Sequence, residues 1–123
     1  MPERNLVLGV SGSIAAYKAV DLASKLTQAG VTVYTVMTKN ATKLVAPLSF
    51  SAITGRPAAI DTFADQERFS IGHISLAESA DAVLIAPATA NVIAKIACGI
   101  ADDLLTSTVI ASRAPLIIAP AMH

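Results

Sequence analysis

The sequence predicts an α/β fold with a doubly wound parallel sheet. Three runs, residues 5–10, 82–86 and 115–119, are apolar through their centres, which is typical of strands buried on both faces of a parallel sheet. Each of the first two runs is followed by a turn of small residues and then by a helical pattern. Residues 5–37 have the order and length of a strand–helix–strand unit with a right-handed crossover.

The N-terminal half of the chain predicts this unit and several short elements after it. The apolar face of its helix repeats at helical spacing and comprises Ala15, Ala19, Leu22, Leu26 and Ala29. The expected elements, in order, are strand 5–10, a helix that Gly30 ends, strand 31–37, a short helix through Val45 that Pro47 breaks, a helical turn over 48–53 that ends at Gly55, and a short strand at 58–60.

The C-terminal half predicts two further parallel strands. The expected elements, in order, are an irregular loop over 61–71, a short helix over 75–79, strand 82–86 that Pro87 stops, a helix capped by Thr89 or Asn91 and ended by Gly99, a helix that starts at 101–103, and a buried strand at 115–119. Both strands finish on Ala-Pro-Ala, so we expect their ends to share one ligand-binding edge of the sheet.

The composition indicates a single domain and excludes several classes of partner. The chain has 123 residues, of which 54% are hydrophobic and 15% charged, with nine basic and nine acidic side chains. No apolar run approaches the roughly 18 residues of a membrane span, and no basic stripe indicates nucleic-acid binding. The N-terminus lacks a signal-peptide pattern, and we expect a cytoplasmic protein. The excess apolarity predicts an alanine-rich core together with apolar surface buried between subunits.

The single cysteine, Cys98, excludes an internal disulfide and gives no zinc-binding spacing. Its place in a helical apolar pattern predicts core packing. No paired histidines occur, so no metal site is expected; the acidic pair at 102–103 predicts a helix start.

Candidate binding residues follow the strands. Ser11 and Ser13, in the turn after the first strand, are suited to hydrogen-bonding phosphate oxygens at a helix N-terminus, or to a plain helix cap. The turn matches neither the dinucleotide fingerprint nor the Walker loop. Thr38 ends the neighbouring strand and is expected either at the same edge or as a cap. His73, in a loop upstream of strand 82–86, is either a functional histidine or a surface capping residue.

Taken together, these segments resemble the flavin-containing cysteine decarboxylase family, and within it the members that act on phosphopantothenoylcysteine. The matching segments occur in the family's order and cover nearly the whole chain: 9–18, 48–50 with 54–55, 73–77 with 80–81, 86–91, 99 with 101–105, and 119–122.

The resemblance implies a Rossmann-like domain that binds FMN between the subunits of a homo-oligomer, a trimer or a dodecamer of trimers. The positions it assigns to FMN are Ser11, Gly12, Ser13, Ile14, Thr38, Thr89, Ala90, Asn91, Ala121 and Met122. His73 matches the family's catalytic histidine. The implied reaction oxidises the substrate's cysteine thiol to a thioaldehyde, releases CO₂, and returns the electrons to give 4′-phosphopantetheine.

The chain departs from the family after Met122. The family has a substrate-binding asparagine where this sequence has His123, and then a substrate flap with a reactive cysteine. We therefore expect residues 1–123 to form the FMN-binding decarboxylase domain without that flap, and turnover to be poor. The alternatives are a non-catalytic FMN-binding domain, a peptidyl-cysteine decarboxylase and a flavin prenyltransferase of similar fold.

Overall fold

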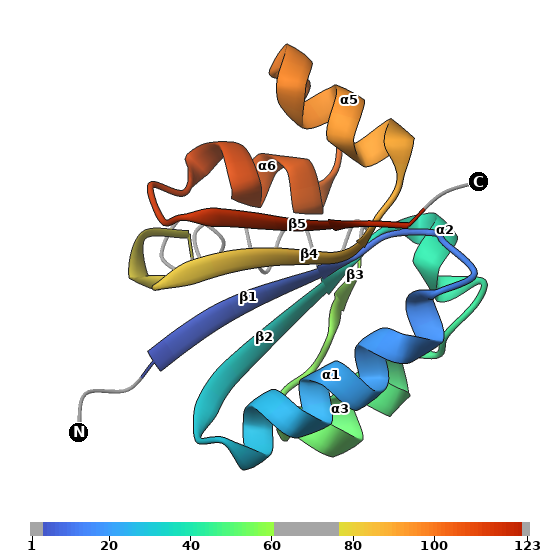
Figure 1. The fold of residues 1–123 in the computed structure, drawn as a ribbon, viewed down its shortest axis with the longest axis vertical. Helices are drawn as coiled ribbons and strands as arrows, with labels where there is room; N and C mark the ends of the chain where they lie inside the picture. The colour runs from blue at the N-terminus through green and yellow to red at the C-terminus, as the bar shows by residue number, and fades with distance from the viewer. Residues whose placement is uncertain (1–3, 61–76, 122–123) are drawn as a thin grey trace.

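The fold is a parallel sheet with helices on both faces, and a computed structural model describes residues 4–60 and 77–121 of it (Figure 1). The five strands lie in the order β3-β2-β1-β4-β5, and every pairing is parallel. The strands are β1 (Arg4–Val10), β2 (Val31–Met37), β3 (Ala59–Ile60), β4 (Ala82–Ala88) and β5 (Leu116–Pro120). The helices are α1 (Ala16–Gln28), α2 (Lys39–Thr42), α3 (Pro47–Thr54), α5 (Ala90–Cys98) and α6 (Leu104–Ala111). The predicted doubly wound α/β fold is confirmed.

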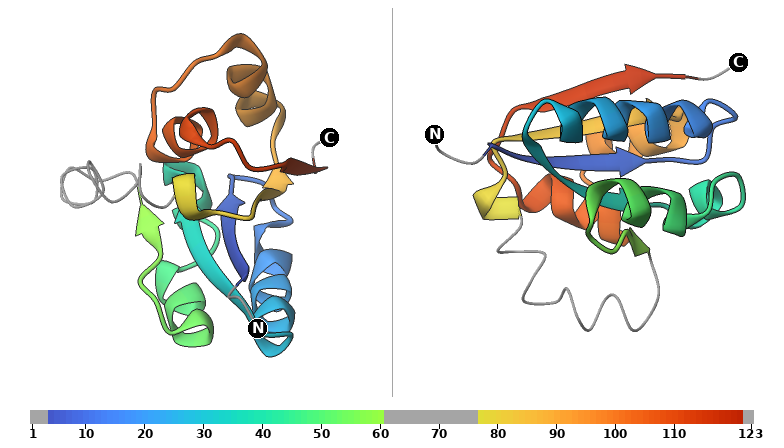
Figure 2. Two further views of the ribbon diagram at one scale, coloured as in Figure 1. Left: turned by 90° about the vertical axis from the view of Figure 1, so that its left-hand side faces the viewer. Right: turned by 90° about the horizontal axis from the view of Figure 1, so that it is seen from below.

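The sheet separates two apolar cores. On one face, α1 and α3 pack on a cluster that includes Leu8, Met37 and Phe50. On the other face, α5 and α6 pack on a cluster that includes Val7, Ile85 and Leu105 (Figures 1 and 2). A Cβ atom at Gly9 would lie 2.5 Å from Leu105 Cδ1, so the glycine permits the close approach of α6 to β1.

The strands that follow β1 in the chain are added first on one side of it and then on the other. Strands β2 and β3 extend the sheet from one edge of β1, and β4 and β5 extend it from the other. This reversal creates a topological switch point between β1 and β4, where ligands bind in open α/β sheets.

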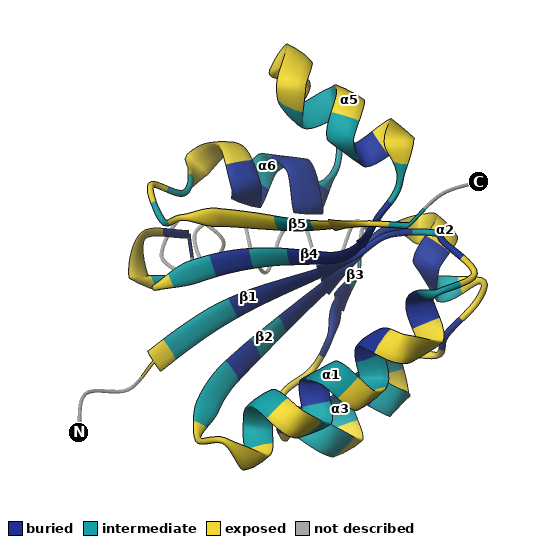
Figure 3. Cartoon of the chain, viewed as in Figure 1, coloured by how far each residue is buried: buried dark blue, intermediate teal, exposed yellow. Residues whose placement is uncertain are grey.

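Two predictions about the later strands are wrong. β4 continues through Pro87 to Ala88, past a cis Ala86–Pro87 peptide bond and a register shift against β5. The proline is tolerated because the ladder is already irregular there. β5 is not buried: it is an edge strand, and Ile117 is 52% exposed (Figure 3). An apolar run identifies a strand but does not distinguish a central strand from an edge strand.

The remaining elements agree closely with the predictions. Gly30, Gly55 and Gly99 have positive φ angles and follow the helices they were expected to end, Gly30 coming directly after the C-cap residue Ala29. Helix α2 is shorter than expected and ends at Thr42. Cys98 is exposed at the last turn of α5, so its predicted core packing is wrong. The loop over 61–71 and the start of the helix over 75–79 lie outside the described residues. Among the residues that the structure describes, no helix is long and apolar enough to cross a membrane.

Candidate functional site

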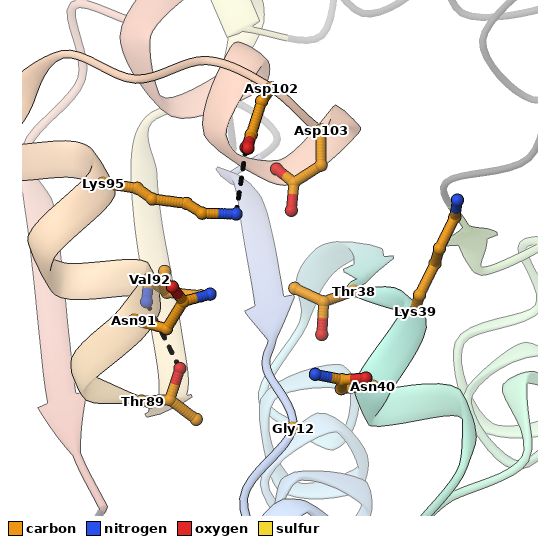
Figure 4. Close-up of a pocket in the computed structure, with 10 residues that line it drawn as sticks. All are labelled: Gly12, Thr38, Lys39, Asn40, Thr89, Asn91, Val92, Lys95, Asp102 and Asp103. Carbon is orange, nitrogen blue, oxygen red and sulfur yellow. Dashed lines mark hydrogen bonds and ion pairs between the residues drawn. The ribbon is translucent and has the colours of Figure 1, made fainter.

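A polar pocket of about 470 Å³ opens at the carboxyl ends of β1, β2 and β4, beside the switch point. Its volume lies within the range of small-molecule sites. Ten residues line it: Gly12, Thr38, Lys39, Asn40, Thr89, Asn91, Val92, Lys95, Asp102 and Asp103 (Figure 4). Four of them, Gly12, Thr38, Thr89 and Asn91, were predicted from the sequence to bind FMN.

Two threonines cap the helices on either side of the polar pocket. Thr38 Oγ1 accepts a hydrogen bond from the backbone N–H of Ala41 at 3.2 Å, and Thr89 Oγ1 accepts one from Val92 N–H at 3.3 Å. The capping interpretation of Thr38 is therefore confirmed, and of the two candidate caps for α5 the structure selects Thr89. Neither hydroxyl donates a hydrogen bond to another described residue, so both can donate to a ligand.

Gly12 brings the β1–α1 turn against α2. A Cβ atom at Gly12 would lie 2.5 Å from Asn40 Cβ and 3.2 Å from the Asn40 carbonyl carbon. Any larger residue would have to displace the start of α2, which carries Lys39 and Asn40 into the pocket. The glycine therefore sets the width of the pocket on this side.

Ser11 lies beneath the pocket and has a structural role that the sequence did not reveal. Its side chain is fully buried; Oγ donates to Pro87 O at 2.6 Å and accepts from Thr89 N–H at 3.0 Å. Because a serine hydroxyl carries one hydrogen, it has none left to donate to a phosphate. In this arrangement Ser11 joins the ends of β1 and β4, and its predicted contact with a phosphate stays a prediction.

The charged side chains of the pocket are mostly paired. Lys95 Nζ lies 3.1 Å from Asp102 Oδ1, and Asp103 Oδ1 accepts from Thr106 N–H at 2.8 Å in a capping box at the start of α6. The predicted helix start at 102–103 is confirmed. Lys39 has no carboxylate partner within the described part of the chain. Sequence reasoning missed Lys39, Asn40 and Lys95 as pocket residues, although the position of Lys39 beside Thr38 was a usable signal.

A separate apolar cavity of about 350 Å³ lies on the α1 face of β4 and β5. The two Ala-Pro segments meet there, because Ala88 pairs with Pro120 and Ala121 N–H donates to Ala88 O at 3.0 Å. This confirms that the two strand ends lie side by side. Its lining residues are Ala15, Lys18, Ala19, Leu22, Ala86, Pro87, Ala119, Pro120 and Ala121.

The other predicted site residues lie around these two cavities or outside the described residues. Ser13 is nearly buried and accepts from Ala15 N–H, while Ile14 is 72% exposed. Ala90 is exposed at the start of α5. His73, Met122 and His123 lie outside the described residues, so their assigned roles stay predictions. No group of three or more potential metal-binding side chains gathers anywhere in residues 4–60 and 77–121.

Comparison with known proteins identifies the family. The model of the family described as Flavoprotein matches residues 1–123. The chain belongs to the Flavoprotein family. It is 52% identical over 120 residues to the coenzyme A biosynthesis bifunctional protein CoaBC of Bacillus subtilis. The matched region covers 98% of this chain and 30% of that protein. The CoaBC protein of Vibrio cholerae is 46% identical over the same length. The chain thus spans less than a third of these relatives.

Solved structures of flavoprotein decarboxylases share the fold. The FMN-dependent cysteine decarboxylase TvaF from thioviridamide biosynthesis superposes with a TM-score of 0.89 at 30% identity, covering 99% of this chain and 75% of that one. A PPC decarboxylase mutant complexed with pantothenoylaminoethenethiol gives a TM-score of 0.83 at 34% identity, covering 99% and 69%. The family resemblance seen in the sequence motifs is therefore confirmed.

Proposed function

We propose that this flavoprotein domain uses FMN to decarboxylate 4′-phosphopantothenoylcysteine to 4′-phosphopantetheine in coenzyme A biosynthesis, in the cytoplasm. The observation that carries the proposal is the 52% identity to CoaBC over 98% of the chain. The similarity to a PPC decarboxylase fold supports the same reaction.

The residues at the switch point fit the polar end of FMN. The polar pocket offers the hydroxyls of Thr38 and Thr89, the amide of Asn91 and the ammonium groups of Lys39 and Lys95, a donor set suited to a phosphate and its ribityl chain. Gly12 keeps the turn below this pocket free of a side chain. The apolar cavity beside Pro87 and Ala121 is suited to an apolar ring system.

FMN, when bound, supplies two-electron oxidation and reduction, which decarboxylation beside a thiol carbon requires. The protein's part is to bind and orient. We propose that Thr38 and Thr89 hydrogen-bond the cofactor, and that His73 acts on the substrate thiol or positions its carboxylate. His123 stands where the family has its substrate-binding asparagine, and we propose that it lies at the substrate.

We also propose that the domain functions as a homo-oligomer, trimeric or dodecameric, with the FMN site between subunits. Large apolar side chains exposed on α1, α3 and the turn before α1 support this, since exposed apolar surface is often buried between subunits. Ile14, Tyr17 and Leu48 are 72%, 63% and 74% exposed, and Ile14 belongs to the turn that begins the site.

Carbon dioxide release from purified protein tests the proposal. We expect a yellow protein that releases CO₂ from phosphopantothenoylcysteine, and a His73→Ala variant that retains flavin but loses this activity. Equal CO₂ release by the wild-type protein and the His73→Ala variant would show that His73 has no part in the mechanism. A colourless protein that FMN does not reconstitute would refute the proposed function.

A decarboxylase of another cysteine compound is the second candidate. The TM-score of 0.89 to TvaF, a cysteine decarboxylase from a different biosynthesis, favours it. Comparing CO₂ release from phosphopantothenoylcysteine and from a peptide ending in cysteine separates the two reactions. A flavin-loaded protein that releases CO₂ from neither would indicate a non-catalytic FMN-binding domain.

A further inference from the structure

Lys95 enters the polar pocket from α5 and is held there by an ion pair. Its side chain is only 25% exposed, and its Nζ lies 3.1 Å from Asp102 Oδ1 across the loop that joins α5 to α6 (Figure 4). The pair Lys25–Asp21, on the outer face of α1, has a similar distance of 2.9 Å, but its side chains are 73% and 69% exposed. Lys95 is therefore the sheltered member of two otherwise similar lysine–aspartate pairs.

A lysine ammonium group has three hydrogens to donate. Asp102 is the only partner of Lys95 within the described part of the chain. The ion pair engages one oxygen of Asp102, so hydrogens of the ammonium group remain available to a ligand in the pocket. Lys95 thus retains donor capacity at the wall of a cavity large enough for a small molecule.

The other charges of the pocket indicate what that ligand carries. The carboxylate of Asp103 is engaged by the N–H and hydroxyl of Thr106, and that of Asp102 is engaged by Lys95. Lys39, on the opposite wall, has no carboxylate partner among the described residues. The ammonium groups of Lys39 and Lys95 thus keep hydrogens that no described carboxylate takes up, and such donors match an anion rich in acceptor oxygens.

We propose that Lys95 binds a phosphomonoester in the polar pocket and that Asp102 is its positioning residue. The inference rests on the proposed function, which brings two phosphomonoesters to this edge of the sheet, FMN and 4′-phosphopantothenoylcysteine. Both present the same dianionic group, and the two arms of the experiment distinguish them.

The cofactor arm compares FMN with riboflavin, which lacks the phosphate. Apoprotein is titrated with each flavin, and the ratio of the two dissociation constants measures the contribution of the phosphate. We expect Lys95→Gln to lower the preference for FMN by about tenfold or more, the loss typical of one charge-assisted hydrogen bond. Lys95→Arg should retain most of the preference. Lys25→Gln, the matched control, should leave it unchanged.

The substrate arm compares phosphopantothenoylcysteine with pantothenoylcysteine on FMN-loaded protein, by binding and by CO₂ release. A loss of preference for the phosphorylated compound in Lys95→Gln, with FMN preference intact, would assign Lys95 to the substrate phosphate. Lys95→Met, which keeps the apolar stem, replaces Lys95→Gln if that variant does not fold.

If Lys95→Gln still binds flavin and keeps its preference for the phosphorylated compound in both arms, the inference is overturned. Lys95 would then serve only to hold the α5–α6 loop through its ion pair with Asp102. Wild-type protein that binds neither FMN nor phosphopantothenoylcysteine would instead refute the proposed function, and the inference with it.

Discussion

The hydroxyl group of Ser11 joins the two central strands where they end. It donates to Pro87 O and accepts from Thr89 N–H, and the side chain is fully buried. Ser11→Ala would leave the Thr89 N–H without its partner and Pro87 O with only the 3.3 Å hydrogen bond from the Ser11 backbone N–H. We expect it to lower the free energy of unfolding by about 1–3 kcal/mol, measured by urea denaturation. Ser24→Ala, which removes a hydroxyl bonded only to Gln28 on α1, should change it by less than about 0.5 kcal/mol. Equal losses would contradict this role.

The absent side chain at Gly12 sets the distance between the β1–α1 turn and α2. Gly12→Ala would place a methyl group 2.5 Å from Asn40 Cβ, so the turn and α2 must move apart. We expect FMN affinity to fall by roughly tenfold or more, since small displacements of a polar site weaken several hydrogen bonds together.

The double variant Gly12→Ala, Asn40→Gly removes the clashing Cβ atom and tests the cause. The double variant should regain part of the lost FMN affinity. Flavin fluorescence titration measures this affinity, and the Asn40→Gly single variant is the reference. A double variant whose loss equals the sum of the two single losses would show that the Asn40 contact is irrelevant.

At the scale of elements, the start of α6 depends on its capping box. Asp103 accepts from Thr106 N–H, and Thr106 Oγ1 accepts from Asp103 N–H. We expect Asp103→Ala to lower the free energy of unfolding by about 0.5–2 kcal/mol, measured by urea denaturation. Asp21→Ala, which breaks only an exposed ion pair, should cost less than about 1 kcal/mol. The reverse order would contradict a capping role for Asp103.

The two faces of β5 provide a prediction at the scale of the whole molecule. Ile117 is 52% exposed, whereas Ile118 packs against the α5–α6 core. We expect Ile117→Lys to change the free energy of unfolding, measured by urea denaturation, by less than about 1 kcal/mol. We expect the same variant to self-associate less in sedimentation experiments, because a lysine on an edge strand opposes strand-to-strand contact. Ile118→Lys should lower the free energy of unfolding by about 2 kcal/mol or more, because it places a charge against the apolar α5–α6 core. Unchanged self-association in Ile117→Lys would exclude this edge from any interface between copies.

Much of the fold was predictable because a parallel sheet buries both faces of its inner strands. The apolar runs that became β1 and β4 and the glycines that end α1, α3 and α5 are local signals. The exposure of β5 was not predictable, because it depends on the order of the strands in the sheet, which leaves β5 with β4 as its one neighbouring strand. The hydrogen bonds of Ser11 to residues 87 and 89 and the pairing of Lys95 with Asp102 depend on tertiary contacts that no local pattern encodes.

The order of the strands also has a consequence for how the chain folds while the ribosome synthesises it. β1 is made first yet lies at the centre of the sheet, and its residue Leu6 pairs with Ala82 of β4. At ordinary rates of translation, about 5–20 residues per second, β4 is synthesised roughly 4–15 s after β1. During that interval β1 can be covered on one side by β2 while its other edge stays open. A nascent chain of this fold therefore exposes an apolar strand edge for seconds, which makes it a suitable client for a ribosome-associated chaperone.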